Sequence, residues 1–201
     1  EPNTSAIADM GYAYHYFVKL NLPLLLKAVF IAALLATGIQ ASAADPEPTT
    51  LIFVIAAEME ASRSPDPGLS TTGAEQAKLL ASSLAGTDIS AIYTTYVNRA
   101  VQTVTPLAKD HQQKLDYFRL NGDPELTSSI IRDMVKKNKG KTIVICSDPE
   151  NIPAMMRQAG VRGKAVKTLY DKGCGQVLVV KLSGSNDAVA QKLNMNIRKK
   201  V

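Results

Sequence analysis

The chain has 201 residues, of which 46% are hydrophobic and 20% are charged, and its formal net charge is +5. These values are typical of a globular protein, and the length allows one domain with an appendage. The basic residues are not interleaved with aromatic residues, so the composition gives little support for nucleic-acid binding.

The first 43 residues have the pattern of a short extension followed by a secretory signal. Lys19 and Lys27 precede an apolar stretch at 28–38, and the small residues Ala41-Ser42-Ala43 follow that stretch. This order is typical of a bacterial signal that is cleaved after Ala43. An uncleaved membrane anchor is the alternative, although Lys27 leaves the apolar stretch shorter than a span of roughly 20 residues. We therefore expect a periplasmic or secreted domain of residues 44–201.

Residues 44–201 alternate between short apolar runs and amphipathic helical patterns. The predicted strands are 49–56, 91–95, 114–120, 141–148 and 175–182. Thr72 and Glu75 form the pattern of a capping box that opens the first helix, whose apolar face includes Leu80 and Leu84. Further helices are predicted at 98–110, 125–138 and 150–160.

This alternation predicts an α/β fold, a three-layer α/β/α sandwich with a largely parallel sheet. In such folds the ligand site lies beyond the carboxyl ends of the strands. The polar segment 62–73, which follows the first strand, should lie over the same edge of the sheet.

Cys146 and Cys174 are the two cysteines, and an exported protein meets an oxidising compartment. Their spacing leaves two interpretations open, a disulfide or two separate small side chains. With His111 as the single histidine in residues 44–201, the residues do not suggest a zinc site, and no metal or other cofactor is predicted.

Four segments in chain order resemble the histidine phosphatase superfamily, also called the phosphoglycerate mutase-like family. They are "LIFV" with the following "AE", "DPGLSTTGAEQAKLLASSL", "ISAIYTTYVNRAVQTVTPLA" and "TIVICSDPENIPAMM". The resemblance covers roughly residues 49–183. It implies a pocket in which one histidine takes the phosphoryl group while two arginines and a second histidine hold the phosphate oxygens.

The resemblance places different residues at most of these pocket positions. Ile55 stands where the first arginine is expected, and Ala56 stands where the nucleophilic histidine is expected. Glu58 and Arg99 match the family's glutamate and second arginine, whereas Asp148 replaces the second histidine. A methyl group can neither attack phosphorus nor accept a proton, so the resemblance implies a degenerate member without phosphohistidine chemistry.

The remaining polar residues give ligand-binding candidates rather than a catalytic set. Arg99 and Asp148 should pair with each other in a half-buried cleft. Glu58 is expected to make a structural hydrogen bond, with a general-base role beside Asp148 as the alternative. Cys174 would be a lone thiol nucleophile without a histidine partner. His111 should lie at the far end of the helix that starts near Arg99, roughly 18 Å from the pocket.

These residues favour an exported pseudophosphatase that acts as a binding or interaction module for a small anion or a protein. A membrane would be contacted only through an uncleaved signal segment. The alternative is an active extracytoplasmic phosphomonoesterase with a rearranged pocket.

Overall fold

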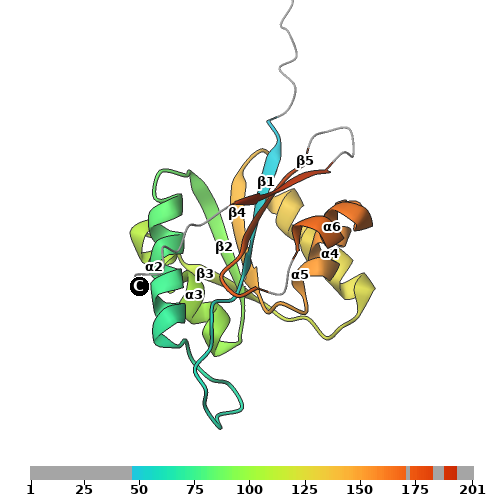
Figure 1. Cartoon of the computed structure of the whole chain (residues 1–201). Helices are drawn as coiled ribbons and strands as arrows, with labels where there is room; N and C mark the ends of the chain where they lie inside the picture. Colours follow the sequence, from blue (N-terminus) through green and yellow to red (C-terminus); the bar gives the residue numbers. More distant parts are fainter. Residues whose placement is uncertain (1–46, 171–172, 183–187, 194–201) are drawn as a thin grey trace, which may run out of the picture. The chain divides into compact units, whose positions relative to one another are not determined.

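The computed structural model describes residues 47–170, 173–182 and 188–193 (Figure 1). All of them belong to the unit Asp45–Val201 into which the chain divides. The predicted extension and secretory signal, residues 1–43, lie outside the described residues. In the described ranges, none of the helices combines the length and the apolar character that crossing a membrane requires.

The described strands form one six-stranded sheet in the order β3-β2-β4-β1-β5-β6. Its first four strands in the chain are mutually parallel, whereas β5 runs antiparallel to β1, and β6 antiparallel to β5. The strands are β1 (Thr49–Ile55), β2 (Ile89–Thr95), β3 (Leu115–Phe118), β4 (Thr142–Ser147), β5 (Val177–Leu182) and β6 (Ala188–Leu193). The prediction of a largely parallel sheet is therefore confirmed.

Five described helices cover the two faces of this sheet (Figure 1). Side chains alternate along β1, so Leu51, Phe53 and Ile55 pack in one apolar cluster with residues of three helices, and Ile52, Val54 and Ala56 pack in another with residues of two. The first face is covered by α4 (Pro124–Lys137), α5 (Ile152–Gln158) and α6 (Gly163–Leu169), and the second by α2 (Thr71–Leu84) and α3 (Asn98–Asp110). This arrangement confirms the three-layer sandwich.

Two elements were absent from the sequence-based prediction. Strand β6 is an edge strand in which no residue is buried, and only Val166 is buried in the seven-residue helix α6. Neither segment has the apolar periodicity that marks a buried element. Tertiary packing stabilises both elements, and the periodicity of the sequence alone does not predict such packing.

The start of α2 differs from the predicted capping box at Thr72 and Glu75. The N-cap is Ser70, whose hydroxyl oxygen accepts a hydrogen bond from the Gly73 N–H at 3.0 Å. Ser70 is held there by Glu58, because its N–H donates to the Glu58 carbonyl at 3.0 Å and its hydroxyl donates to the Glu58 carboxylate at 2.8 Å. A contact with the segment after β1 therefore decides where the helix begins.

The segment between β1 and α2 lies over the carboxyl edge of the parallel strands, as predicted. Met59 and Leu69 form an antiparallel bridge at its base. At its tip, the Asp66 carboxylate accepts hydrogen bonds from the Asn98 N–H at 2.9 and 3.2 Å. Val97, the N-cap residue of α3, provides no side-chain cap of its own. Asp66 therefore caps α3 from a distant segment.

Candidate functional site

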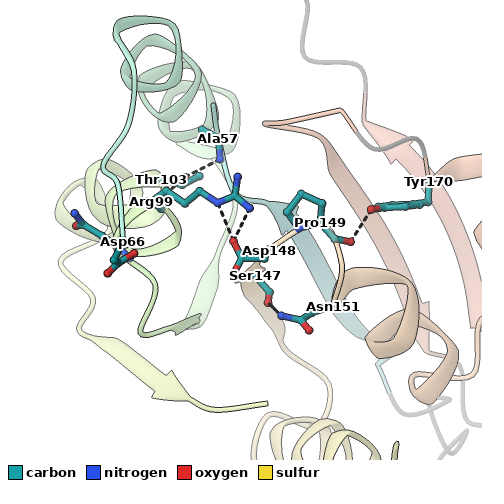
Figure 2. A network of polar contacts seen from close by, with 10 residues as sticks. Ala57, Asp66, Arg99, Thr103, Ser147, Asp148, Pro149, Asn151 and Tyr170 are labelled. Carbon is teal, nitrogen blue, oxygen red and sulfur yellow. Dashed lines mark hydrogen bonds and ion pairs between the residues drawn. The ribbon is translucent and has the colours of Figure 1, made fainter. Parts of the chain in front are cut away.

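The segments that follow β1 and β4 meet at the carboxyl edge of the sheet. Ile55 is paired with Ser147 in the parallel register, so Ala56 and Asp148 follow at neighbouring strand ends. Arg99 is the second residue of α3 and points toward Asp148 (Figure 2). The topology thus brings together three of the residues that the sequence resemblance singled out.

Arg99 and Asp148 form a hydrogen-bonded ion pair. The Arg99 Nε donates to Asp148 Oδ1 at 2.8 Å, and Arg99 Nη2 lies 2.7 Å from the same oxygen (Figure 2). The two side chains are only 13% and 17% exposed, so the pair is poorly screened by water. The predicted pairing is confirmed, and each charge compensates the other.

Residues 55–57 are completely buried, and none of their side chains faces a solvent-filled cleft. Ile55 lies in the apolar cluster formed with α4, α5 and α6, and Ala56 in the cluster formed with α2 and α3. The Ala56 N–H donates to the Ser147 carbonyl at 2.9 Å, and the Ala57 N–H donates to Thr103 Oγ1 at 2.9 Å. The backbone is therefore fixed at the position where the resemblance expects a nucleophile.

Thr103 links this segment to α3. Its hydroxyl accepts from the Ala57 N–H and donates to the Arg99 carbonyl at 2.7 Å, one helical turn earlier. The hydroxyl therefore uses both its donor and an acceptor position within the protein. The sequence analysis gave Thr103 no role, and the structure shows that it joins the segment after β1 to α3.

Glu58 has the structural role expected for it. Its N–H donates to Gln76 Oε1 at 2.9 Å, and its carboxylate accepts the Ser70 hydroxyl at 2.8 Å. Within the described ranges, no hydrogen bond or ion pair joins Glu58 to Asp148. The arrangement thus supports a residue that attaches the segment after β1 to α2, and gives no support to a pair of catalytic carboxylates.

Both cysteines are free thiols, so the structure does not contain the disulfide that the sequence left open. Strand β1 lies between β4, which holds Cys146, and β5, which Cys174 precedes. Strands two positions apart are separated by about 9.6 Å, whereas a disulfide needs Cα atoms within about 7 Å. Cys146 is buried against the α2 and α3 side of the sheet, and Cys174 is exposed.

The surroundings of Cys146 also make it unreactive. Burial raises the pKa of its thiol far above the ordinary value, the Asp148 carboxylate raises it further, and the Arg99 guanidinium lowers it. Because the thiolate is the nucleophilic form, this thiol is unsuited to catalysis. Among the residues that the structure describes, no group of three or more His, Cys, Asp or Glu is arranged to hold a metal ion.

His111 lies where the sequence predicted, at the carboxyl end of α3 and away from Arg99. It is the C-cap residue of α3, and its Nε2 lies 3.2 Å from the Leu84 carbonyl oxygen at the end of α2. His111 therefore contacts the carboxyl ends of α2 and α3. These helix ends lie at the opposite end of α3 from Arg99, so His111 is far from the position where the resemblance expects a nucleophile.

The structure has a cleft beside the ion pair that the sequence analysis did not predict. It has a volume of about 390 Å³ and extends from Asp148 toward the ends of β2 and β3; its lining residues are Thr95, Tyr96, Val97, Phe118, Arg119, Leu120, Asp148 and Asn151. The Tyr96 and Tyr117 rings stack with centroids 5.0 Å apart, and the Arg119 guanidinium lies 4.5 Å from the Tyr96 ring centroid. These residues come from three segments, 95–97, 117–120 and 148–151, which the order of strands β3, β2 and β4 makes neighbours.

Comparison with known proteins finds a partial match to one superfamily. The family model described as "Histidine phosphatase superfamily (branch 1)" matches residues 56–120. A search of curated protein sequences found no match to the chain. Because the matched residues begin at Ala56 and include α2, β2, α3 and β3, the family model covers the segments that surround Arg99.

Solved structures extend the similarity over most of the described chain. A phosphoserine phosphatase mutant from Entamoeba histolytica, in complex with phosphoserine, has a TM-score of 0.59 and 17% identity, covering 74% of this chain and 98% of its own. Mycobacterial glucosyl-3-phosphoglycerate phosphatase has a TM-score of 0.61 and 11% identity, with coverages of 74% and 99%. The protein histidine phosphatase SixA, complexed with tungstate, has a TM-score of 0.59 and 14% identity, with coverages of 73% and 97%. At these identities the likeness concerns the fold.

Proposed function

The chain has the histidine phosphatase fold, and from this premise we propose that it is an exported, catalytically inactive member that acts as a binding or interaction module. One observation supports this proposal above the others. Residues 55–57 are sealed in the core, while the one matching cation, Arg99, is neutralised by Asp148.

Phosphoryl transfer through histidine requires an imidazole nitrogen with free access to phosphorus. Ala56 offers a methyl group, and that methyl group is packed against α2 and α3. Moving the nearest histidine to this position would require displacing His111 along the whole length of α3. The protein therefore has neither the reacting group nor the access that the reaction needs.

Phosphate binding is also opposed by charge. At an effective dielectric constant near 20, a carboxylate about 4 Å from a phosphate charge raises the interaction energy by roughly 4 kcal/mol. Asp148 would impose this repulsion on a phosphate held by Arg99, since the two side chains are in direct contact. A ligand of this site should therefore be something other than a phosphate dianion.

The alternative is an active phosphomonoesterase with a rearranged pocket, and the phosphatase neighbours favour it. It would need a nucleophile other than histidine, for which exposed Cys174 is the candidate. A thiol without an adjacent base is a weak nucleophile near neutral pH, so we rank this function second.

Phosphatase assays on the purified whole chain test the proposal. We expect no hydrolysis of aryl phosphates or of phosphohistidine above background, because Ala56 stands where the family's nucleophilic histidine is expected. The parent and the Arg99→Ala variant should give the same rate. Turnover by the parent that disappears in Arg99→Ala would establish the active alternative, and turnover that disappears in Cys174→Ser would identify its nucleophile.

A further inference from the structure

The cleft beside the ion pair shares Asp148 with the motif positions and extends from it toward the α4, α5 and α6 side of the sheet. Thr95 is the last residue of β2 and follows Ala91 and Tyr93, which face the apolar cluster on the α4, α5 and α6 side. Asn151, which also lines the cleft, immediately precedes α5 on that side. Thr103 and Ala56 lie on the α2 and α3 side. Asp148 contacts both sides, because it pairs with Arg99 of α3 and also lines the cleft.

The hydroxyl group of Thr95 is the first observation that suggests a ligand in this cleft. Thr95 is only 6% exposed and lines the cleft. Its Oγ1 has no hydrogen-bond partner among the residues that the structure describes, whereas the neighbouring Thr94 hydroxyl donates to the Thr95 carbonyl at 3.2 Å. A buried hydroxyl without a hydrogen-bond partner is energetically unfavourable, and a hydrogen bond with a bound molecule would remove that cost.

Apart from Arg119, whose guanidinium lies over the Tyr96 ring, the other polar groups of the cleft favour a neutral ligand. The Asp148 charge is balanced by Arg99, and both of the Arg99 contacts fall on Oδ1. Asn151 is neutral, and its Nδ2 donates to Ser147 Oγ at 3.1 Å (Figure 2). A hydroxyl group can donate to a carboxylate and accept from a threonine or an amide, so hydroxyl groups complement this set. A phosphate, which only accepts when fully ionised, would meet the carboxylate without a proton to donate.

The apolar part of the lining fits the same kind of molecule. Val97, Phe118 and Leu120 form carbon surfaces beside the polar groups, and Arg119 lies over Tyr96 at the rim. Molecules that have hydroxyl groups at their edges and C–H groups on their faces match such a mixed surface. The volume of about 390 Å³ lies at the lower end of the range of about 300–1,000 Å³ for small-molecule sites.

We propose that this cleft binds a neutral, hydroxyl-rich molecule of about monosaccharide size, with Thr95, Asp148 and Asn151 as its polar contacts. The inference rests on the proposed binding function and names the class of its ligand. It differs from the phosphatase site that the fold suggests, because the ligand needs no anionic group and lies toward α5.

Saturation-transfer difference NMR on the whole chain tests this site, with glucose and myo-inositol as hydroxylated probes and methyl phosphate, whose methyl protons can be observed, as the anionic probe. We expect transfer to at least one hydroxylated probe, and titration of that probe should show an affinity about fivefold weaker in Thr95→Val, which removes one hydrogen bond and keeps the shape. Thr105→Val is the matched control, because its hydroxyl bonds to Val101 within α3 and lies outside the cleft. Leu120→Trp should abolish binding by filling the cleft.

The possible outcomes separate this inference from the proposed function. Absence of transfer to both hydroxylated probes, or equal affinity in the parent and Thr95→Val, would overturn the inference. Transfer to methyl phosphate in place of the hydroxylated probes would overturn it as well. The phosphatase assays decide the proposed function independently, since a chain without turnover can still lack a sugar-binding cleft.

Discussion

At the scale of single residues, the ion pair between Arg99 and Asp148 distinguishes this site from a phosphate pocket. The sequence resemblance places Arg99 where the family holds phosphate, and the structure shows its guanidinium committed to a carboxylate. Such a part-buried pair adds modest stability while it is intact, and breaking it leaves one charge poorly solvated. The pair therefore gives a direct test of what the site can bind.

Asp148→Ala should lower stability and create an affinity for anions. We expect a loss of about 1–3 kcal/mol in the free energy of unfolding, because Arg99 loses its partner. Phosphate at tens of millimolar should then raise the melting temperature of the variant and leave the parent unchanged, since a ligand stabilises only the state that it binds. Thermal unfolding with and without phosphate measures both effects.

Asp116→Ala is the matched control for this substitution. Asp116 pairs with Lys137 at 3.7 Å, with side chains that are 48% and 69% exposed, so its removal should cost less than about 1 kcal/mol. It should show no dependence on phosphate. If Asp148→Ala responds to phosphate no more than Asp116→Ala does, Arg99 is not an available anion contact and the account of the site is wrong.

The two thiols should react very differently with iodoacetamide at pH 8. Cys174 is exposed, whereas Cys146 is buried and has a raised pKa. The raised pKa belongs to the folded state, so the contribution of Cys146 to stability is present below the ordinary thiol pKa of about 8.5 and is lost as the pH rises above it. Mass spectrometry should find one alkylated thiol in the native protein and two after unfolding without reductant. Zero alkylated thiols after unfolding would show that the cysteines are bonded.

At the scale of elements, the attachment of β1 to α2 depends on close backbone contact. Glu58 accepts hydrogen bonds from Ser70 through both its carbonyl and its carboxylate, and Ser70 caps α2. Gly73 permits this approach, because a Cβ at Gly73 would lie 2.0 Å from the Glu58 carbonyl oxygen. A glycine early in a helix would otherwise be a weak choice.

Gly73→Ala should therefore destabilise the protein by at least about 2 kcal/mol, because the new methyl group displaces the Glu58 backbone. Gly163→Ala is the control, since a Cβ at Gly163 meets no atom within 4 Å. That substitution should stabilise by about 0.4–1 kcal/mol by restricting the unfolded chain. Urea unfolding of the two variants measures both changes. Equal effects of the two substitutions would contradict the close contact.

At the scale of the whole molecule, both apolar clusters are formed by residues between Leu51 and Leu193. The described core thus falls within the predicted domain of residues 44–201. For residues 1–43 we propose an extension and a signal segment that is removed after export.

Expression of the whole chain in a bacterium tests this proposal. The exported protein should begin at Ala44, as read by mass spectrometry, and should have the same melting temperature as a chain produced from residue 44. Ala43→Phe should block cleavage, because the position before the cut requires a small residue. Intact chain recovered with the membrane would instead support the uncleaved anchor.

The sequence alone determined the local features of this protein. Apolar periodicity located β1, β4, α3 and the body of α2, because a repeat of two or about 3.6 residues is set by the element itself. The motif around Ala56 and Arg99 indicated both the fold and the altered pocket. The pairing of Arg99 with Asp148 followed from their opposite charges and from the resemblance, which places both residues in one pocket.

Only the tertiary structure decided the features that depend on strand order and on contacts between distant segments. Placing β1 between β4 and β5 separates Cys146 from Cys174, and no local pattern reports that order. Ser70 replaced Thr72 as the cap of α2 because Glu58 reaches it from the other side of a loop. The cleft at Thr95 arises where the ends of β2, β3 and β4 meet the start of α5, so it exists only after those segments have packed.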